Sequence, residues 1–151
     1  MRGMRHRETT GLRALAALRL VIGGVFLYAA GTKLGDMAAF AEQVANYRIL
    51  PAATVAPAAA LLPGIEMVIG TLLVLGIATR AAAALAAASM ALFVTALTVA
   101  LARGINLECG CFGGADVATW TTVVRDLALL VLALAVAIGG PGRLSGRPAE
   151  G

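Results

Sequence analysis

Two cysteines are the residues of this chain most suited to chemistry. Cys109 and Cys111 are the only cysteines among 151 residues, and Gly110 alone separates them. A Cys-x-Cys disulfide closes a very small ring, which strains the bond, and a central glycine relieves part of that strain. A strained, exposed disulfide is easily reduced, whereas a disulfide that closes almost no loop adds little stability. The spacing therefore favours a pair that exchanges with other thiols.

Two other interpretations of the cysteine pair stay open. The pair could form an inert disulfide that only shapes its loop. It could instead bind a metal, but a structural zinc site needs four ligands. The single histidine, His6, is predicted to lie on the other side of the membrane. We therefore predict no metal site.

A charged pair follows the cysteines, at Arg125 and Asp126. A cation near a cysteine lowers the pKa of its thiol and favours the reactive thiolate. Arg125 is therefore a candidate catalytic residue together with Cys109 and Cys111. The alternative is that the two charges only mark a solvated helix start, where an acid is favourable.

The composition shows which elements must position these residues. Hydrophobic residues make up 60% of the chain and charged residues only 13%, and the mean hydropathy is +0.91. A soluble domain has about 45–50% apolar and about 25% charged residues. The chain is therefore predicted to be an integral membrane protein with the lipid bilayer as its partner. The net charge of +4 forms no basic cluster interleaved with aromatic residues, so we predict no nucleic-acid partner.

Long apolar runs predict an all-α membrane domain over residues 14–138, a four-transmembrane-helix bundle. The expected spans are residues 14–32, 52–78, 81–102 and 121–138, preceded by a basic N-terminus over 1–13 and followed by a tail over 139–151. The first run also resembles a signal peptide, but its length favours an uncleaved helix. Pro57 and Pro63 predict a kink or a late start in the second span. Thr121 or Thr122 is expected to cap the last one.

A short amphipathic helix is expected at the interface between the first two spans. Its apolar residues recur at helical spacing, at Met37, Phe40, Val44 and Tyr47. Asp36 is expected to cap its start, and Pro51 to stop it.

Positive charge predicts the orientation. The side that holds both termini collects seven basic residues, and the side of the cysteine loop collects four, Lys33, Arg48, Arg103 and Arg125. We therefore expect the termini in the cytoplasm and the cysteine loop on the extracytoplasmic or periplasmic side of a bacterial inner (plasma) membrane. Disulfides persist in that compartment because it is oxidising.

Glu66 falls near the middle of the second span, where an isolated carboxylate is costly. Two roles are equally open: a group that handles protons or contacts a quinone, and a buried polar contact that fixes helix packing. Arg19 of the first span and a water held by Thr71 are its candidate partners. Arg19 itself is expected to snorkel to the interface.

Three further residues are expected near the membrane surface. Lys33 and Asp36 lie on the same outer side and are expected to pair. Trp120 fits an interfacial aromatic anchor.

The order of several motifs resembles the MauE (methylamine utilisation) and DoxX-like membrane proteins. The matching motifs are Gly31-x-Lys33-Leu34-x-Asp36-x3-Phe40, Tyr47-x2-Leu50-Pro51, Leu62-Pro63-x2-Glu66-x3-Gly70, Cys109-Gly110-Cys111-Phe112-Gly113 and Arg125-Asp126. The last two match the MauE branch in particular, and the resemblance covers about residues 14–138.

The resemblance implies a four-helix membrane protein linked to redox maturation of exported proteins. In the methylamine pathway this means maturation, disulfide formation or transport of the disulfide-rich small subunit of methylamine dehydrogenase. The four-helix plan is also similar to that of the quinone-linked disulfide-forming proteins DsbB and VKOR. This chain departs from them because it has one cysteine pair and lacks a second pair that would relay electrons.

Two functions of different classes follow. The first is a membrane thiol–disulfide oxidoreductase in which Cys109 and Cys111 exchange with a thioredoxin-like protein or an exported disulfide-rich client, with Glu66 as a candidate quinone contact. The second is a non-enzymatic assembly factor or transporter component in which the disulfide shapes a docking loop.

Overall fold

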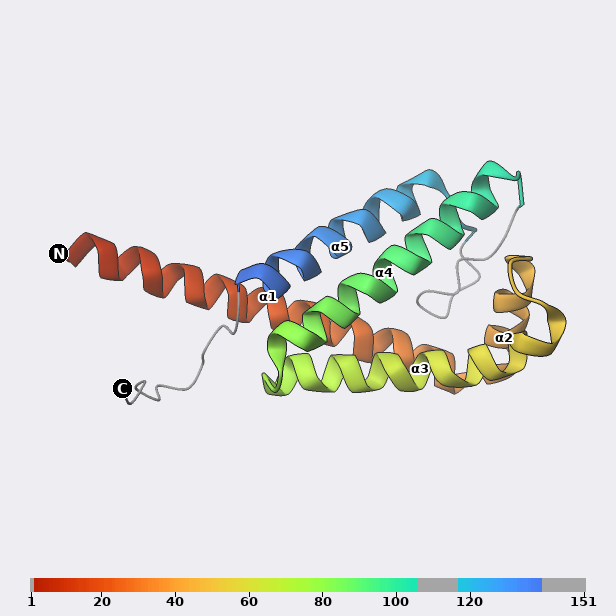
Figure 1. Cartoon of the computed structure of the whole chain (residues 1–151), viewed down its shortest axis with the longest axis horizontal. Coiled ribbons are helices and arrows are strands. Elements are labelled where there is room, and N and C mark those ends of the chain that lie inside the picture. The colour runs from red at the N-terminus through yellow and green to blue at the C-terminus, as the bar shows by residue number, and fades with distance from the viewer. Residues whose placement is uncertain (1, 106–116, 140–151) are drawn as a thin grey trace.

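The computed structural model of this chain describes residues 2–105 and 117–139, which form five α-helices (Figure 1). The helices are α1 (Arg2–Gly35), α2 (Met37–Asn46), α3 (Ala52–Leu75), α4 (Thr79–Ala102) and α5 (Trp120–Gly139). Four of them are long and apolar enough to cross a membrane, over Arg13–Gly35, Ala52–Leu75, Thr79–Ala102 and Trp120–Gly139. The predicted four-helix membrane fold, with a short helix between the first two spans, is confirmed. The chain is a multi-pass membrane protein.

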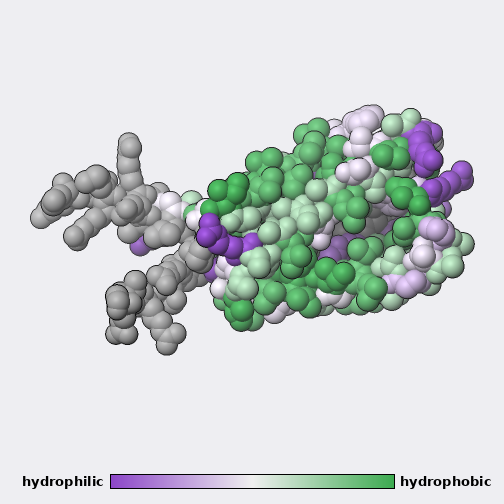
Figure 2. Space-filling view, in the orientation of Figure 1, coloured by the Kyte–Doolittle hydropathy of each residue, from purple (hydrophilic) through white to green (hydrophobic). Residues whose placement is uncertain are grey.

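The surface agrees with this assignment. Figure 2 shows a hydrophobic surface along the middle of the bundle, with hydrophilic groups gathered towards its two ends. Large apolar side chains such as Leu61, Leu92 and Ile138 are more than 60% exposed. Lipid can cover such side chains without cost, whereas water could not.

Several helix ends differ from those expected. The first helix continues past residue 32 to Gly35, and α3 stops at Leu75 rather than near residue 78. Gly76 ends α3 because its φ of 75° is left-handed, a conformation that glycine adopts at little cost. Helix α3 begins at Ala52 and continues through both prolines, so the expected late start is wrong.

The cap of α2 agrees with the sequence prediction, and the cap of α5 does not. Asp36 caps α2 as expected, since its side chain accepts a hydrogen bond from the Ala39 amide at 3.0 Å. Helix α2 ends at Asn46, before it reaches Pro51. The expectation of a cap at Thr121 or Thr122 is wrong, because α5 already starts at Trp120.

The helices associate as two pairs. Helix α1 packs against α3, and α4 packs against α5, while α1 also touches α5 and α3 touches α4. The α1–α3 crossing depends on Gly23 and Gly70: a methyl group on Gly70 would lie 2.9 Å from the Gly23 carbonyl oxygen. Small residues at such a crossing allow two backbones to approach closely, as is common in membrane bundles.

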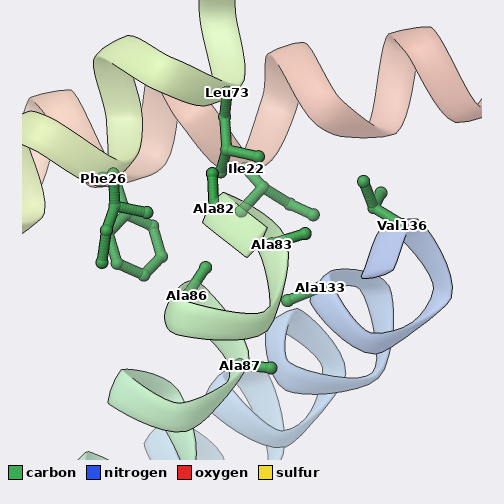
Figure 3. Close-up of a cluster of buried hydrophobic side chains, with 10 residues drawn as sticks. Ile22, Phe26, Leu73, Ala82, Ala83, Ala86, Ala87, Ala133 and Val136 are labelled. Atoms are coloured by element: carbon green, nitrogen blue, oxygen red, sulfur yellow. The ribbon is translucent and has the colours of Figure 1, made fainter. Parts of the chain in front are cut away.

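We call the end of the bundle at Gly76–Ala78, where α3 turns into α4, the turn end. Here all four long helices meet in one apolar cluster. Figure 3 shows its side chains pointing towards one another from the four helices, among them Phe26 of α1, Leu73 of α3, Ala83 of α4 and Val136 of α5. The alanines of α4 let the neighbouring helices approach, so the two pairs are joined tightly at this end.

Two arginines lie at the turn end. Arg19 is only 5% exposed, and its guanidinium lies against Gly76, where α3 ends. Arg80 donates hydrogen bonds to the carbonyl oxygens of Ala137 and Ile138, at 3.4 and 3.3 Å, where α5 ends. A cation is favourable beside the carbonyl end of a helix. Arg19 thus reaches the end of the bundle, as snorkelling predicts, but stays buried in the protein.

We call the opposite end, where α4 ends and α5 begins, the loop end, because residues 103–119 connect these helices there. Its apolar cluster contains Val94, Leu97, Ala100, Ala118, Val123 and Tyr47, with Phe93, Ala96, Leu101 and Ile105 packed against it. Ile105 and Ala118 lie close to the two limits of the segment 106–116, so both sides of that segment are anchored in one cluster.

Candidate functional site

A buried ion pair lies between α1 and α3. The Lys33 ammonium contacts Oε1 of Glu66, and the two side chains are only 9% and 16% exposed. Oε2 of Glu66 has no hydrogen-bond partner among the described residues. Burial alone would disfavour both charges, but each compensates the other. The free oxygen can accept a hydrogen bond or a proton from a further group.

Helix α2 covers this ion pair. The Lys33 ammonium lies 5.3 Å from the centre of the Phe40 ring, which is a cation–π distance. The expected pairing of Lys33 with Asp36 is wrong, because Lys33 turns to Glu66 and Asp36 caps α2. The physical reason is the difference in environment: the carboxylate inside the bundle needs the cation, whereas Asp36 is exposed.

The expected pairing of Glu66 with Arg19 is also wrong. Arg19 lies at the turn end against Gly76, and Thr71 is exposed on the surface of α3. Lys33 lies fourteen residues after Arg19 on α1, which at 1.5 Å per residue is about 21 Å along the helix. Because α1 and α3 pack in opposite directions, Lys33 rather than Arg19 reaches the level of Glu66.

A second buried acid lies on α5 near the loop end. Asp126 is 2% exposed, and Arg125 donates from Nε to Asp126 Oδ1 at 2.9 Å. The Arg125 side chain is 45% exposed, so the arginine lies at the surface while the acid faces the interior. Oδ2 of Asp126 has no hydrogen-bond partner in the part of the chain that the structure describes. The pair is thus more than a solvated helix start.

Tyr47 connects α2 to this region. Its ring makes an edge-to-face contact with Phe93 of α4, with centroids 6.2 Å apart, and its side chain is buried. Burial raises the pKa of the Tyr47 phenol well above its usual range, and the negative charge of Asp126 raises it further. The phenol therefore lies within the electrostatic reach of Asp126 and stays protonated.

The structure describes two of the four predicted site residues. Glu66 is buried and paired, and Arg125 is half-exposed and paired. Cys109 and Cys111 lie outside the described residues. Their roles and that of Arg125 stay predictions.

The sequence analysis did not select Lys33, Asp126 or Tyr47 as functional candidates. Each was visible as a polar residue in a motif, but nothing in the linear pattern showed that all three are buried. For Asp126 the useful signal would have been its position inside the predicted span 121–138, since a charge inside a span needs a partner.

The chain was compared with known proteins. The family model described as "Methylamine utilisation protein MauE" matches residues 12–139. The chain is 36% identical over 141 residues to the "Methylamine utilization protein MauE" of Paracoccus denitrificans, and the match covers 91% of this chain and 75% of that protein. No solved structure matches the chain. The family match extends over the four candidate membrane spans, and together the two matches show that the chain belongs to the MauE family.

Proposed function

We propose that this chain is a membrane thiol–disulfide redox protein that supports oxidative maturation of exported proteins, within methylamine utilisation as the names of its family and its relative suggest. One observation carries the proposal: in a chain of the MauE family, both cysteines fall in the connection between α4 and α5, separated by Gly110 alone. We further propose that this connection faces the extracytoplasmic side of the bacterial inner membrane. The excess of positive charge on the opposite side supports this orientation.

The proposed reaction is disulfide exchange. Two thiols of an exported client reduce the Cys109–Cys111 disulfide, so that the client gains a disulfide and the pair takes up two electrons and two protons. A disulfide of a thioredoxin-like protein then accepts these electrons and protons and restores the pair. Each step proceeds through a mixed disulfide after attack by a thiolate.

Arg125 supports this chemistry less strongly than the sequence suggested. Its guanidinium is already paired with Asp126 at 2.9 Å, which neutralises part of the charge that would favour a cysteine thiolate. Its side chain is 45% exposed near the start of α5, so it still lies on the surface of the bundle at the loop end. This pairing is the observation that favours the second candidate function, a non-enzymatic assembly factor in which the disulfide shapes a docking loop.

Glu66 is the group of this chain best suited to contact a lipid-soluble quinone. Its Oε2 has no partner among the described residues and can accept a hydrogen bond from a quinol hydroxyl. A bound quinone would supply an acceptor for two electrons and two protons. The same oxygen serves equally in the proton-handling role, and the contact with Lys33 supports the packing role.

The experiment is thiol trapping with a membrane-impermeant maleimide in intact cells. We expect Cys109 and Cys111 to be unreactive before mild reduction and labelled after it, and Cys109→Ser and Cys111→Ser each to abolish client oxidation.

Three results would contradict the proposal in different ways. Labelling only after the membrane is permeabilised would show the opposite orientation. Two thiols that react without reduction would exclude a resting disulfide. Partial client oxidation in both serine variants would leave the assembly-factor function.

A further inference from the structure

The two helix pairs are joined differently at the two ends of the bundle. At the turn end, α1 and α3 contribute Ile22, Phe26, Ile69 and Leu73 to the same cluster as the alanines of α4 and the residues of α5. At the loop end, the cluster consists of residues from α4, α5 and the connection between them, with one addition. Among the described residues, Tyr47 is its only member from the first half of the chain.

The arrangement in space agrees with this difference. Figure 1 shows α3 and α4 meeting at the turn end and diverging towards the loop end, where α2 lies beside α3. Helix α2 is anchored to the first pair through the contact of Phe40 with Lys33. Phe40 and Tyr47 are seven residues apart, which is two helical turns, so both lie on the same face of α2. One end of that face touches α1, and the other touches α4.

From these contacts we propose that Tyr47 is a latch that holds the two helix pairs together at the loop end. The latch has two parts. The ring packs edge-to-face against Phe93, with the two ring centroids 6.2 Å apart, which is an arrangement that aromatic pairs favour. The side chain also lies in the apolar cluster that contains Val123 of α5. The latch thus connects α2 to both helices of the second pair.

The latch controls access to the polar interior of the bundle. The Lys33–Glu66 ion pair lies in the first helix pair and Asp126 in the second, and each acid has one oxygen without a partner among the described residues. Opening at the loop end would admit a molecule between the pairs towards these groups. The apolar cluster at the turn end joins all four long helices tightly, so this cluster acts as the fixed point of the motion. This inference does not depend on the proposed thiol chemistry.

The geometry of the backbone next to Tyr47 suits a latch. Arg48 has a φ of 52°, a left-handed conformation that is costly for a residue with a side chain. Ile49 and Leu50 follow, and they are 47% and 42% exposed. A strained residue and two half-exposed apolar side chains therefore lie directly beside the Tyr47 contact.

The test measures the distance between the pairs in the full-length chain by double electron–electron resonance in lipid nanodiscs. Spin labels at Leu61 of α3 and Leu92 of α4 report on the loop half, and labels at Leu75 and Leu85 report on the turn half. All four side chains are exposed. Serine replaces Cys109 and Cys111 so that only the introduced cysteines carry labels.

We expect Tyr47→Ala to broaden the 61–92 distances and shift them to longer values, while the 75–85 distances stay unchanged. Tyr47→Phe keeps the ring contact and should give a smaller broadening of the 61–92 distances. The matched control is Tyr28→Ala, since Tyr28 is 61% exposed on α1, and it should change neither pair of labels.

Unchanged 61–92 distances in Tyr47→Ala would overturn the latch. If Tyr47→Ala changes both label pairs, the variant reports on folding as a whole, and Phe93→Leu decides instead. Phe93→Leu removes the ring that Tyr47 contacts on the other side. Broadening of the 61–92 distances alone then supports the latch, and any other result with Phe93→Leu overturns it.

Discussion

The turn end and the loop end of this bundle are held together by different forces. At the turn end, small and apolar side chains from four helices interlock, and Arg19 and Arg80 lie against the last residues of α3 and α5. At the loop end, Tyr47 is the one described residue of the first half of the chain in the apolar cluster, and each helix pair holds a buried acid with a basic partner.

The difference shows where this membrane protein is rigid and where it can respond. The attraction between closely packed atoms falls off steeply as the helices separate. The turn end therefore has one stable arrangement. A buried charge is stable only while its partner stays in place, and inside a membrane such groups usually have a function. The loop end is therefore the more polar end and, with the proposed latch, the end that can open; the chain segment with both cysteines connects α4 to α5.

The largest loss of stability is expected when one charge of the buried Lys33–Glu66 pair is removed. Lys33→Met leaves Glu66 inside the bundle without its cation, and breaking a buried pair in this way costs about 3–5 kcal/mol. The double variant Lys33→Met/Glu66→Met should recover most of that loss, because no charge remains to be compensated. Unfolding by denaturant in mild detergent measures both. A double variant no more stable than the single one would show that the pair does not act as a unit.

A smaller but still large effect is expected at the α1–α3 crossing. Gly70→Ala places a methyl group 2.9 Å from the Gly23 carbonyl oxygen and 2.8 Å from Leu27, and overpacking of this kind costs about 1–3 kcal/mol. Gly64→Ala is the matched control on the same helix, because nothing lies within 4 Å of its added methyl group. The melting temperatures of the two variants provide the comparison. Equal values would mean that the crossing is looser than the structure indicates.

The smallest effect on stability is expected from the ionisation of Tyr47 at alkaline pH. Since the folded state raises the pKa of the phenol, the protonated form is favoured by folding. Its contribution to stability is complete below the usual tyrosine pKa of about 10 and is lost as the pH rises above it, by at most about 1.4 kcal/mol per pH unit. The wild type should therefore lose stability more steeply above about pH 10 than Tyr47→Phe. Thermal unfolding at several pH values measures this.

Tyr28→Phe provides the control for that experiment, because it removes an exposed phenol instead of the buried one. Its pH dependence should follow that of the wild type. If Tyr47→Phe also follows the wild type, the phenol is not protected by the loop-end cluster.

The sequence determined the class of fold because the relevant signals are local. Four long apolar runs, the Asp36 cap and the helical spacing of Met37, Phe40, Val44 and Tyr47 each depend on residues within a few positions of one another. The sequence placed the helix ends less exactly, because several residues close together can end or start a helix, as around Gly76 and at Thr121 and Thr122.

Only the tertiary structure decided which charges meet. Lys33 has Asp36 three residues away and Glu66 thirty-three residues away, and it pairs with the distant one. Linear spacing cannot show this choice, because the energy depends on which acid the packing of α1 against α3 removes from water. In the same way, Arg125 and Asp126 are neighbours in sequence, but the orientation of α5 leaves the first at the surface and buries the second.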